Sequence, residues 1–125
     1  MARILVIDDE ELARFTLREI LEAAGHEVVE ATNGNEGTAS QRANPCDMVI
    51  TDMIMPEKEG LETIVELKGA YPDLKVIAIS GGGRTRNLDF LQLAGELGAD
   101  QVIVKPFSED ELMKGVNACL SGREA

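Results

Sequence analysis

Four short, mostly apolar runs in this chain each lead into a polar or charged residue. Runs of this length and composition are typical of strands buried on both faces of a parallel sheet. In open α/β sheets, ligands bind outside the carboxyl ends of the strands, so the polar residues at those ends are candidates for chemistry. The runs and their followers are residues 4–7 with Asp8 and Asp9, residues 48–50 with Asp52, residues 75–79 with Ser80, and residues 102–104 with Lys105.

Segments of helical character separate these runs, and a further strand is expected at residues 27–31. Most of the segments carry apolar stripes at helical spacing, and Ser108 with Glu111 forms a capping box before the last one. Crossovers between parallel strands are right-handed, so the alternation predicts an α/β fold with a doubly wound parallel sheet and helices on both faces. The expected helices are residues 11–24, 35–43, 61–71 and 87–97 and the segment after Ser108.

Length and charge narrow the function further. A chain of 125 residues with 44% hydrophobic content fits one domain, residues 1–125, and we expect no output domain. The net charge of −11 disfavours nucleic acids and anionic membranes as direct partners. The sequence has neither an apolar run of membrane-spanning length nor a signal-peptide core, which predicts a cytoplasmic protein. Cys46 and Cys119 lack metal-ligand spacing and are interpreted as structural.

The strand-end residues suggest a reaction class. If the strands ending in Asp8, Asp9 and Asp52 are neighbours, three carboxylates crowd together, which is unfavourable without a cation. Oxygen-only ligands of this kind suit Mg²⁺, whose coordination shell is completed by water and phosphate oxygens. Ser80 adds a hydroxyl donor and Lys105 a phosphate-binding ammonium group. The sequence therefore predicts a phosphoryl-transfer site.

The ordered set of these residues resembles the receiver domains of two-component response regulators, of the CheY-like, stand-alone type. The resemblance extends from Arg3 to about Leu120 and implies a flavodoxin-like, five-stranded sheet with strand order 2-1-3-4-5. The residues that carry it are Asp8-Asp9, Asp52, Met55-Pro56, Gly60, Ser80-Gly81 and Lys105-Pro106-Phe107.

The resemblance implies a role for each of these positions. Asp52 is then the phosphate-accepting nucleophile, Ser80 the switch hydroxyl, and Lys105 the partner of the carboxylate or the phosphoryl group, with a cis Lys105–Pro106 peptide. It also implies a Mg²⁺ site made of the carboxylates of Asp8, Asp9 and Asp52 and the backbone carbonyl of Ile54.

The same resemblance implies a signalling role. The phosphoryl donor is then a sensor histidine kinase or a histidine phosphotransfer protein, and the output is a phosphorylation-dependent contact with an effector, or relay of the phosphoryl group. The chain is then no enzyme beyond its own phosphotransfer and dephosphorylation. The main alternative is a constitutive interaction module, because Val102 stands where many receivers carry an aromatic switch residue.

An enzyme and a nucleotide-binding protein fit the sequence less well. A phosphatase of the haloacid-dehalogenase type places a second acid where this chain has Ile54. The glycines at 81–83 lack the spacing of nucleotide-binding loops.

Several apolar residues lie off the helical stripes. Leu12 and Phe15 are expected to be half-covered at the start of their helix, with a docking patch for the phosphodonor protein as the alternative. Phe90 and Leu93 are candidates for a partner surface in the same sense. Arg84 and Arg86 are expected to be solvated, with anion steering as the alternative, and the lone histidine, His26, is assigned no role.

Overall fold

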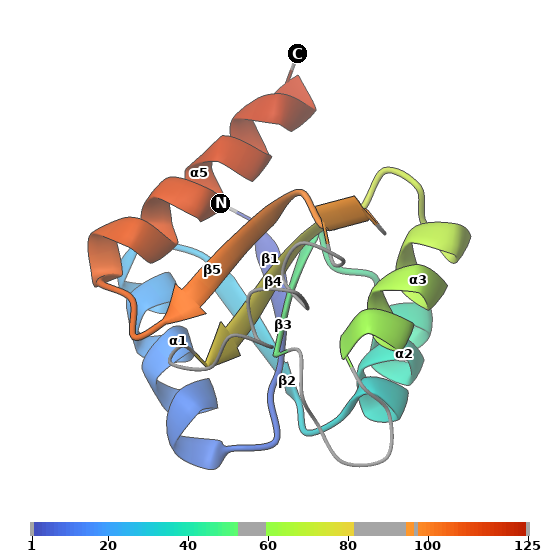
Figure 1. Ribbon diagram of the computed structural model, residues 1–125, viewed down its shortest axis with the longest axis horizontal. Coiled ribbons are helices and arrows are strands. Elements are labelled where there is room, and N and C mark those ends of the chain that lie inside the picture. The colour runs from blue at the N-terminus through green and yellow to red at the C-terminus, as the bar shows by residue number, and fades with distance from the viewer. Residues whose placement is uncertain (1, 53–59, 82–94, 97, 125) are drawn as a thin grey trace.

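The computed structural model describes residues 2–52, 60–81, 95–96 and 98–124. These residues form a central sheet with helices packed on both of its faces (Figure 1). The predicted helix at 87–97 lies almost wholly outside the described residues, as do Phe90, Leu93, Arg84 and Arg86.

The sheet has five strands, all parallel, in the order β2-β1-β3-β4-β5. This confirms the predicted fold class, including the strand order implied by the resemblance. Strand β1 lies between β2 and β3. The residues that follow β1 therefore lie next to the carboxyl ends of both neighbouring strands. The strands are β1 Arg3–Ile7, β2 Glu27–Ala31, β3 Met48–Asp52, β4 Lys75–Gly81 and β5 Gln101–Lys105.

Helices α1 and α5 cover one face of the sheet, and α2 and α3 cover the other (Figure 1). The capping box is confirmed, because the Ser108 N–H donates to Glu111 Oε1 at 3.0 Å and the Glu111 N–H donates to Ser108 Oγ at 3.0 Å. Gly25 follows α1 with a φ of 92°, a left-handed conformation that favours glycine, as expected for a helix stop. The described helices are α1 Glu11–Ala23, α2 Gly34–Ala43, α3 Gly60–Ala70 and α5 Glu109–Glu124.

The core consists of two apolar layers, one on each face of the sheet. Alternate residues of each strand point to opposite faces, so Ile4 and Val6 join one layer while Leu5 and Ile7 join the other. The first layer is completed by Leu17 and Leu21 of α1 and by Leu112, Val116 and Cys119 of α5. Strand β5 forms one edge of the sheet, and its Val102 is 44% exposed.

The expectation that Leu12 is half-covered is wrong, because its side chain is 75% exposed, whereas Phe15, at 56% exposed, is about half-covered as expected. Phe15 precedes the buried Leu17 by two residues, which turns it about 200° around the helix axis, away from the sheet. Val65 of α3 is also 50% exposed. The first two turns of α1 therefore present two large apolar side chains at the surface.

His26 has a partner that the sequence did not reveal. Its Nδ1 accepts a hydrogen bond of 3.0 Å from the backbone N–H of Ala2, at the entrance to β1. Burial lowers the pKa of this imidazole, because desolvation disfavours its charged form. The neutral ring therefore anchors the first residues of the chain beside β2.

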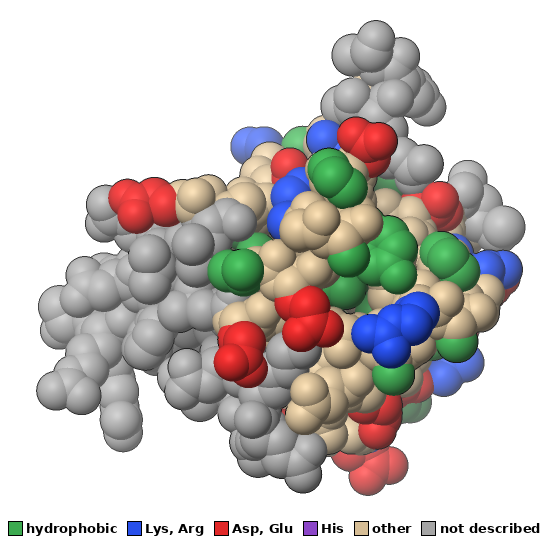
Figure 2. Space-filling view, turned by 90° about the vertical axis from the view of Figure 1, so that its right-hand side faces the viewer, with side chains coloured by type: hydrophobic (Ala, Val, Ile, Leu, Met, Phe, Trp, Pro, Cys, Tyr) green, Lys and Arg blue, Asp and Glu red, His purple; other side chains and the backbone are tan. Residues whose placement is uncertain are grey.

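Figure 2 shows the side of the molecule that carries α2 and α3. Acidic, basic and hydrophobic side chains are interspersed among its described residues. Among the described residues, no helix combines the length and apolar character required to cross a bilayer.

Candidate functional site

Asp8 is the buried centre of the candidate site. It follows β1 directly and is 2% exposed. Its backbone N–H donates to the carbonyl of Ala31 at 3.1 Å, and its Oδ1 accepts from the backbone N–H of Glu10 at 2.9 Å. Its carbonyl oxygen accepts from Arg14 Nη1 at 2.7 Å. Contacts from β2, from α1 and from the turn itself thus fix the position of this carboxylate.

Asp52 lies beside Asp8 because β1 and β3 are neighbours in register. Ile7 pairs with Thr51, so the next residue of each strand, Asp8 and Asp52, reaches the same edge of the sheet. Asp52 is 9% exposed and forms the end of β3. The structure therefore brings together the two carboxylates that were expected to meet at the strand ends.

Lys105 stands between these two carboxylates. Its Nζ lies 3.4 Å from Asp8 Oδ2 and 3.8 Å from Asp52 Oδ1, and its side chain is 26% exposed. It ends β5, and the Lys105–Pro106 peptide that follows is cis, as the resemblance implied. One ammonium group therefore offsets the charge of two largely buried carboxylates, each of which would otherwise repel the other.

A group of carboxylates suited to a cation adjoins this pair. One oxygen each of Asp8, Asp9 and Glu10 lies within 4.8 Å of the others, and the last two residues are exposed. An all-oxygen donor set fits Mg²⁺ better than softer metals. Glu10 was missed as a candidate, although its place in the acidic run after β1 was visible in the sequence. Ile54, the expected carbonyl ligand, lies outside the described residues.

Ser80 lies in β4, where its backbone pairs with Val104 of β5. Strand β4 lies between β3, which carries Asp52, and β5, which carries Lys105. All three strands end at the same edge of the sheet. The backbone of Ser80 thus lies at this edge of the sheet, and its role as a switch hydroxyl stays a prediction.

A groove lies next to the site, between α1 and the segment after β5. Its volume is about 570 Å³, and Lys105 lies in its wall together with the exposed Leu12. Most of the lining is apolar, so the groove joins a hydrophobic surface to the charged strand ends. The lining residues are Glu10, Leu12, Ala13, Thr16, Leu17, Ile20, Lys105, Pro106 and Phe107.

The two cysteines take no part in the site. Cys46 and Cys119 are both buried and free, as expected for structural cysteines. Burial raises the pKa of each thiol to about 11, because the thiolate is poorly solvated there.

Comparisons with known proteins identify the family of this chain. The family model described as "Response regulator receiver domain" matches residues 4–117. The chemotaxis protein CheY of Thermotoga maritima is 34% identical over 116 residues, which cover 92% of this chain and 94% of that protein. A receiver domain protein from Clostridium thermocellum superposes with a TM-score of 0.91 at 34% identity, over 99% of this chain and 98% of the other.

A longer protein contains the same fold. NtrX from Brucella abortus superposes with a TM-score of 0.92 at 31% identity, over 98% of this chain but only 28% of NtrX. The chain thus corresponds to one part of that protein. The family match and the nearly full-length relatives together show that this chain belongs to the receiver domains of response regulators, the signalling modules of two-component systems.

Proposed function

We propose that Asp52 accepts a phosphoryl group from a phosphohistidine on a sensor histidine kinase or a histidine phosphotransfer protein. The observation that carries the proposal is the placement of Lys105 Nζ, 3.4 Å from Asp8 and 3.8 Å from Asp52, beside the acidic cluster. A nucleophilic carboxylate, a cation-binding group and a fixed ammonium ion are the parts that phosphoryl transfer needs.

The reaction is an in-line displacement at phosphorus. A carboxylate oxygen of Asp52 forms a bond to phosphorus while the bond from phosphorus to the donor imidazole nitrogen breaks. The imidazole leaves with the electron pair of that bond and takes up a proton from solvent, and the product on this chain is an acyl phosphate. Hydrolysis of the acyl phosphate by water returns the carboxylate and inorganic phosphate. Beyond these steps we propose no enzymatic turnover.

The acidic side chains would hold Mg²⁺, which family membership makes the expected cofactor. Asp8, Asp9 and Asp52 are the proposed ligands with the carbonyl of Ile54, and the proximity of Glu10 adds a further oxygen donor. When bound, the ion offsets negative charge on the phosphoryl oxygens.

Lys105 and Ser80 act on the phosphoryl group after transfer. Lys105, already between the two carboxylates, would pair with a phosphoryl oxygen once Asp52 is phosphorylated. The Ser80 hydroxyl would donate a hydrogen bond to a second phosphoryl oxygen. This local contact would shift the equilibrium between two conformations of the domain that partner proteins distinguish. The signal would then leave through an effector protein or by relay of the phosphoryl group, in the cytoplasm.

The primary test is intact-mass spectrometry after incubation with acetyl phosphate, with and without Mg²⁺. We expect one Mg²⁺-dependent phosphoryl adduct on the native chain and none on Asp52→Asn. An adduct of equal yield on Asp52→Asn would show that another residue is the acceptor.

The exposed Leu12 and Phe15 support a docking role for the first two turns of α1, beside the groove that reaches Lys105. Phe15→Ala should slow transfer from a phosphorylated histidine phosphotransfer protein and leave phosphorylation by acetyl phosphate unchanged. Val65→Ala is the matched control, because Val65 is 50% exposed but lies on α3. Equal transfer rates for Phe15→Ala and the native chain would remove the docking role.

A constitutive interaction module remains the second candidate. The observation in its favour is Val102, which lies 44% exposed on β5 and lacks the aromatic ring of a typical switch. Partner binding that is the same for unphosphorylated native protein, phosphorylated protein and Asp52→Asn would favour this alternative.

A further inference from the structure

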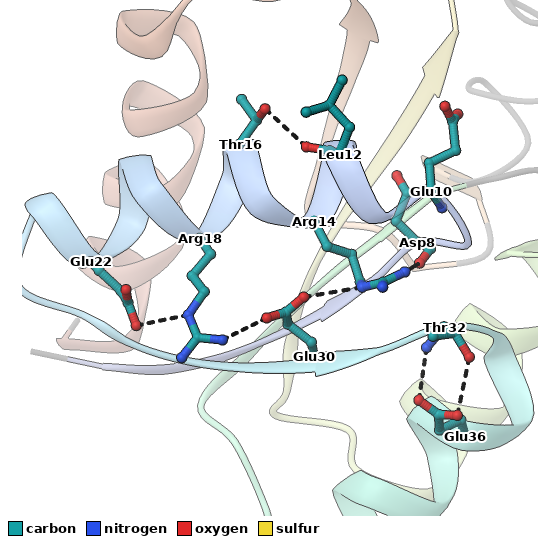
Figure 3. A network of polar contacts seen from close by, with 10 residues as sticks. All are labelled: Asp8, Glu10, Leu12, Arg14, Thr16, Arg18, Glu22, Glu30, Thr32 and Glu36. Atoms are coloured by element: carbon teal, nitrogen blue, oxygen red, sulfur yellow. Dashed lines mark hydrogen bonds and ion pairs between the residues drawn. The ribbon is translucent and has the colours of Figure 1, made fainter.

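Arg14 joins the acidic site to the neighbouring strand. Its guanidinium group donates from Nη1 to the carbonyl oxygen of Asp8 at 2.7 Å and from Nε to Glu30 Oε1 at 3.0 Å. The Arg14 side chain is only 13% exposed, and it lies between the turn after β1 and β2 (Figure 3). The contact to Asp8 is therefore a short, charge-assisted hydrogen bond with little access to water.

The direction of the Asp8 carbonyl affects where the chain continues into Asp9. It belongs to the peptide plane that links Asp8 to Asp9, and this plane is rigid. Asp8 is already held through its own N–H and its carboxylate, so a fixed carbonyl also fixes the direction in which Asp9 continues. The hydrogen bond from Arg14 thereby helps to fix where the backbone of Asp9 begins relative to Asp8.

Glu30 in turn orients Arg14. It lies on β2, where its backbone pairs with Val6 of β1, and its two carboxylate oxygens accept from different arginines of α1. Oε1 accepts from Arg14, and Oε2 accepts from Arg18 Nη1 at 2.6 Å. Arg18 also donates to Glu22 at 3.1 Å, so its guanidinium group is directed along α1 and β2 and away from Asp8 (Figure 3).

We infer that Arg14 is a positioning residue of the acidic site, which holds the carboxylates of Asp8 and Asp9 in an arrangement ready for a divalent cation. The inference rests on the proposed function, because it assigns a purpose to the cluster that this function requires. Residues that orient metal ligands by hydrogen bonds change metal affinity about 10- to 100-fold when they are replaced.

Electrostatics alone leads to the opposite expectation. Removing a positive charge beside carboxylates makes their surroundings more negative, and a divalent cation should then bind more tightly. Positioning predicts weaker binding after the same change. The sign of the affinity change in a variant without the guanidinium group therefore separates the two effects.

The experiment measures Mn²⁺ binding by the loss of the electron paramagnetic resonance signal of free Mn²⁺, with Mg²⁺ as competitor. Arg14→Met keeps most of the apolar stem and removes both donors, and we expect about 10-fold weaker Mn²⁺ binding. Arg18→Met is the matched control, because it removes a neighbouring ion pair with Glu30 and leaves the hydrogen bond from Arg14 to Asp8 in place. We expect its affinity to stay within about 2-fold of the native value, since exposed ion pairs contribute little.

Urea unfolding of both variants separates positioning from general stability. If Arg14→Met is too unstable to measure, Glu30→Gln loosens Arg14 without removing it, and we expect about 3-fold weaker binding, between the control and the 10-fold effect. Native-like or tighter Mn²⁺ binding by folded Arg14→Met would overturn the positioning role. So would an Mn²⁺ affinity of Glu30→Gln equal to that of Arg18→Met. No Mn²⁺ binding by the native chain would instead count against the Mg²⁺ site of the proposed function, and the inference would be abandoned with it.

Discussion

Replacing Gly37 by alanine should destabilise this fold, although the same exchange stabilises most helices. Gly37 is buried in α2, where the helix packs against β1. An added Cβ would overlap Cδ1 of Ile7 and lie 2.9 Å from its Cγ1. Ile7 is 1% exposed and packed on all sides, so its side chain has little room to move.

Two opposing terms set the size of the effect. Overpacking a filled core costs about 1–3 kcal/mol. The gain in helix propensity from glycine to alanine is about 0.5–1 kcal/mol. The free energy of unfolding should therefore fall by about 1 kcal/mol, as the balance of these two contributions.

The assay is urea unfolding followed by far-ultraviolet circular dichroism, with Gly69→Ala as the control. Gly69 lies in α3, and apart from its chain neighbours and the nearby backbone of its own helix no atom of the described residues comes within 4 Å of the place that its Cβ would take, so alanine there should raise the free energy of unfolding by about 0.5 kcal/mol. Combining Gly37→Ala with Ile7→Val, which removes Cδ1, should recover part of the loss through a coupling of about 1 kcal/mol. A stabilising effect of Gly37→Ala equal to that of Gly69→Ala would refute the reasoning, because it would mean that Ile7 moves aside without cost.

Three individual contacts lead to further predictions. Lys105→Met should lower the free energy of unfolding by about 1 kcal/mol in the absence of divalent cations, because Asp8 loses its counter-charge. Thermal melts should show that Mg²⁺ stabilises this variant more than it stabilises the native chain. Equal stabilisation of the two proteins by Mg²⁺ would contradict this. Ser108→Ala removes the capping hydroxyl of α5 and should cost about 1 kcal/mol in urea unfolding, whereas Ser108→Thr should cost less. The pKa of His26 is lowered in the folded state, so its contribution to stability is complete above the unfolded value of about 6.5 and is lost as the pH falls below it. His26→Gln should therefore flatten the decline of the urea midpoint between about pH 7 and pH 5, and an unchanged slope would show that other groups cause it.

The strands and the strand-end residues could be predicted from the sequence because each signal is local. An apolar run followed by Asp8 or Asp52 is visible without knowledge of the fold, and parallel pairing then brings the two residues together. The residues that hold the site could not be predicted in this way. Arg14 and Glu30 are both ordinary polar positions of an amphipathic helix and a strand, and only the packing of α1 beside β2 makes them partners.

Helix α2 shows another limit of hydrophobic periodicity. Its predicted range, 35–43, is nearly that of the structure, but its pattern was weak. The reason is that its buried face is made of Gly34, Gly37, Thr38 and Gln41, none of which is strongly apolar. Small residues allow close approach to β1, and Gln41 meets its hydrogen-bonding needs through the backbone of Cys46. Close packing of this kind leaves no apolar stripe in the sequence.

The pairing of Lys105 with Asp8 spans 97 positions of the chain. During synthesis, the carboxylates of the site leave the ribosome long before the lysine that balances them. Until β5 adds to the sheet, a partly made chain holds acidic side chains at a strand end with no ammonium group of Lys105 between them. The phosphoryl acceptance proposed for Asp52 should therefore begin only when β5 docks and brings Lys105 to the site.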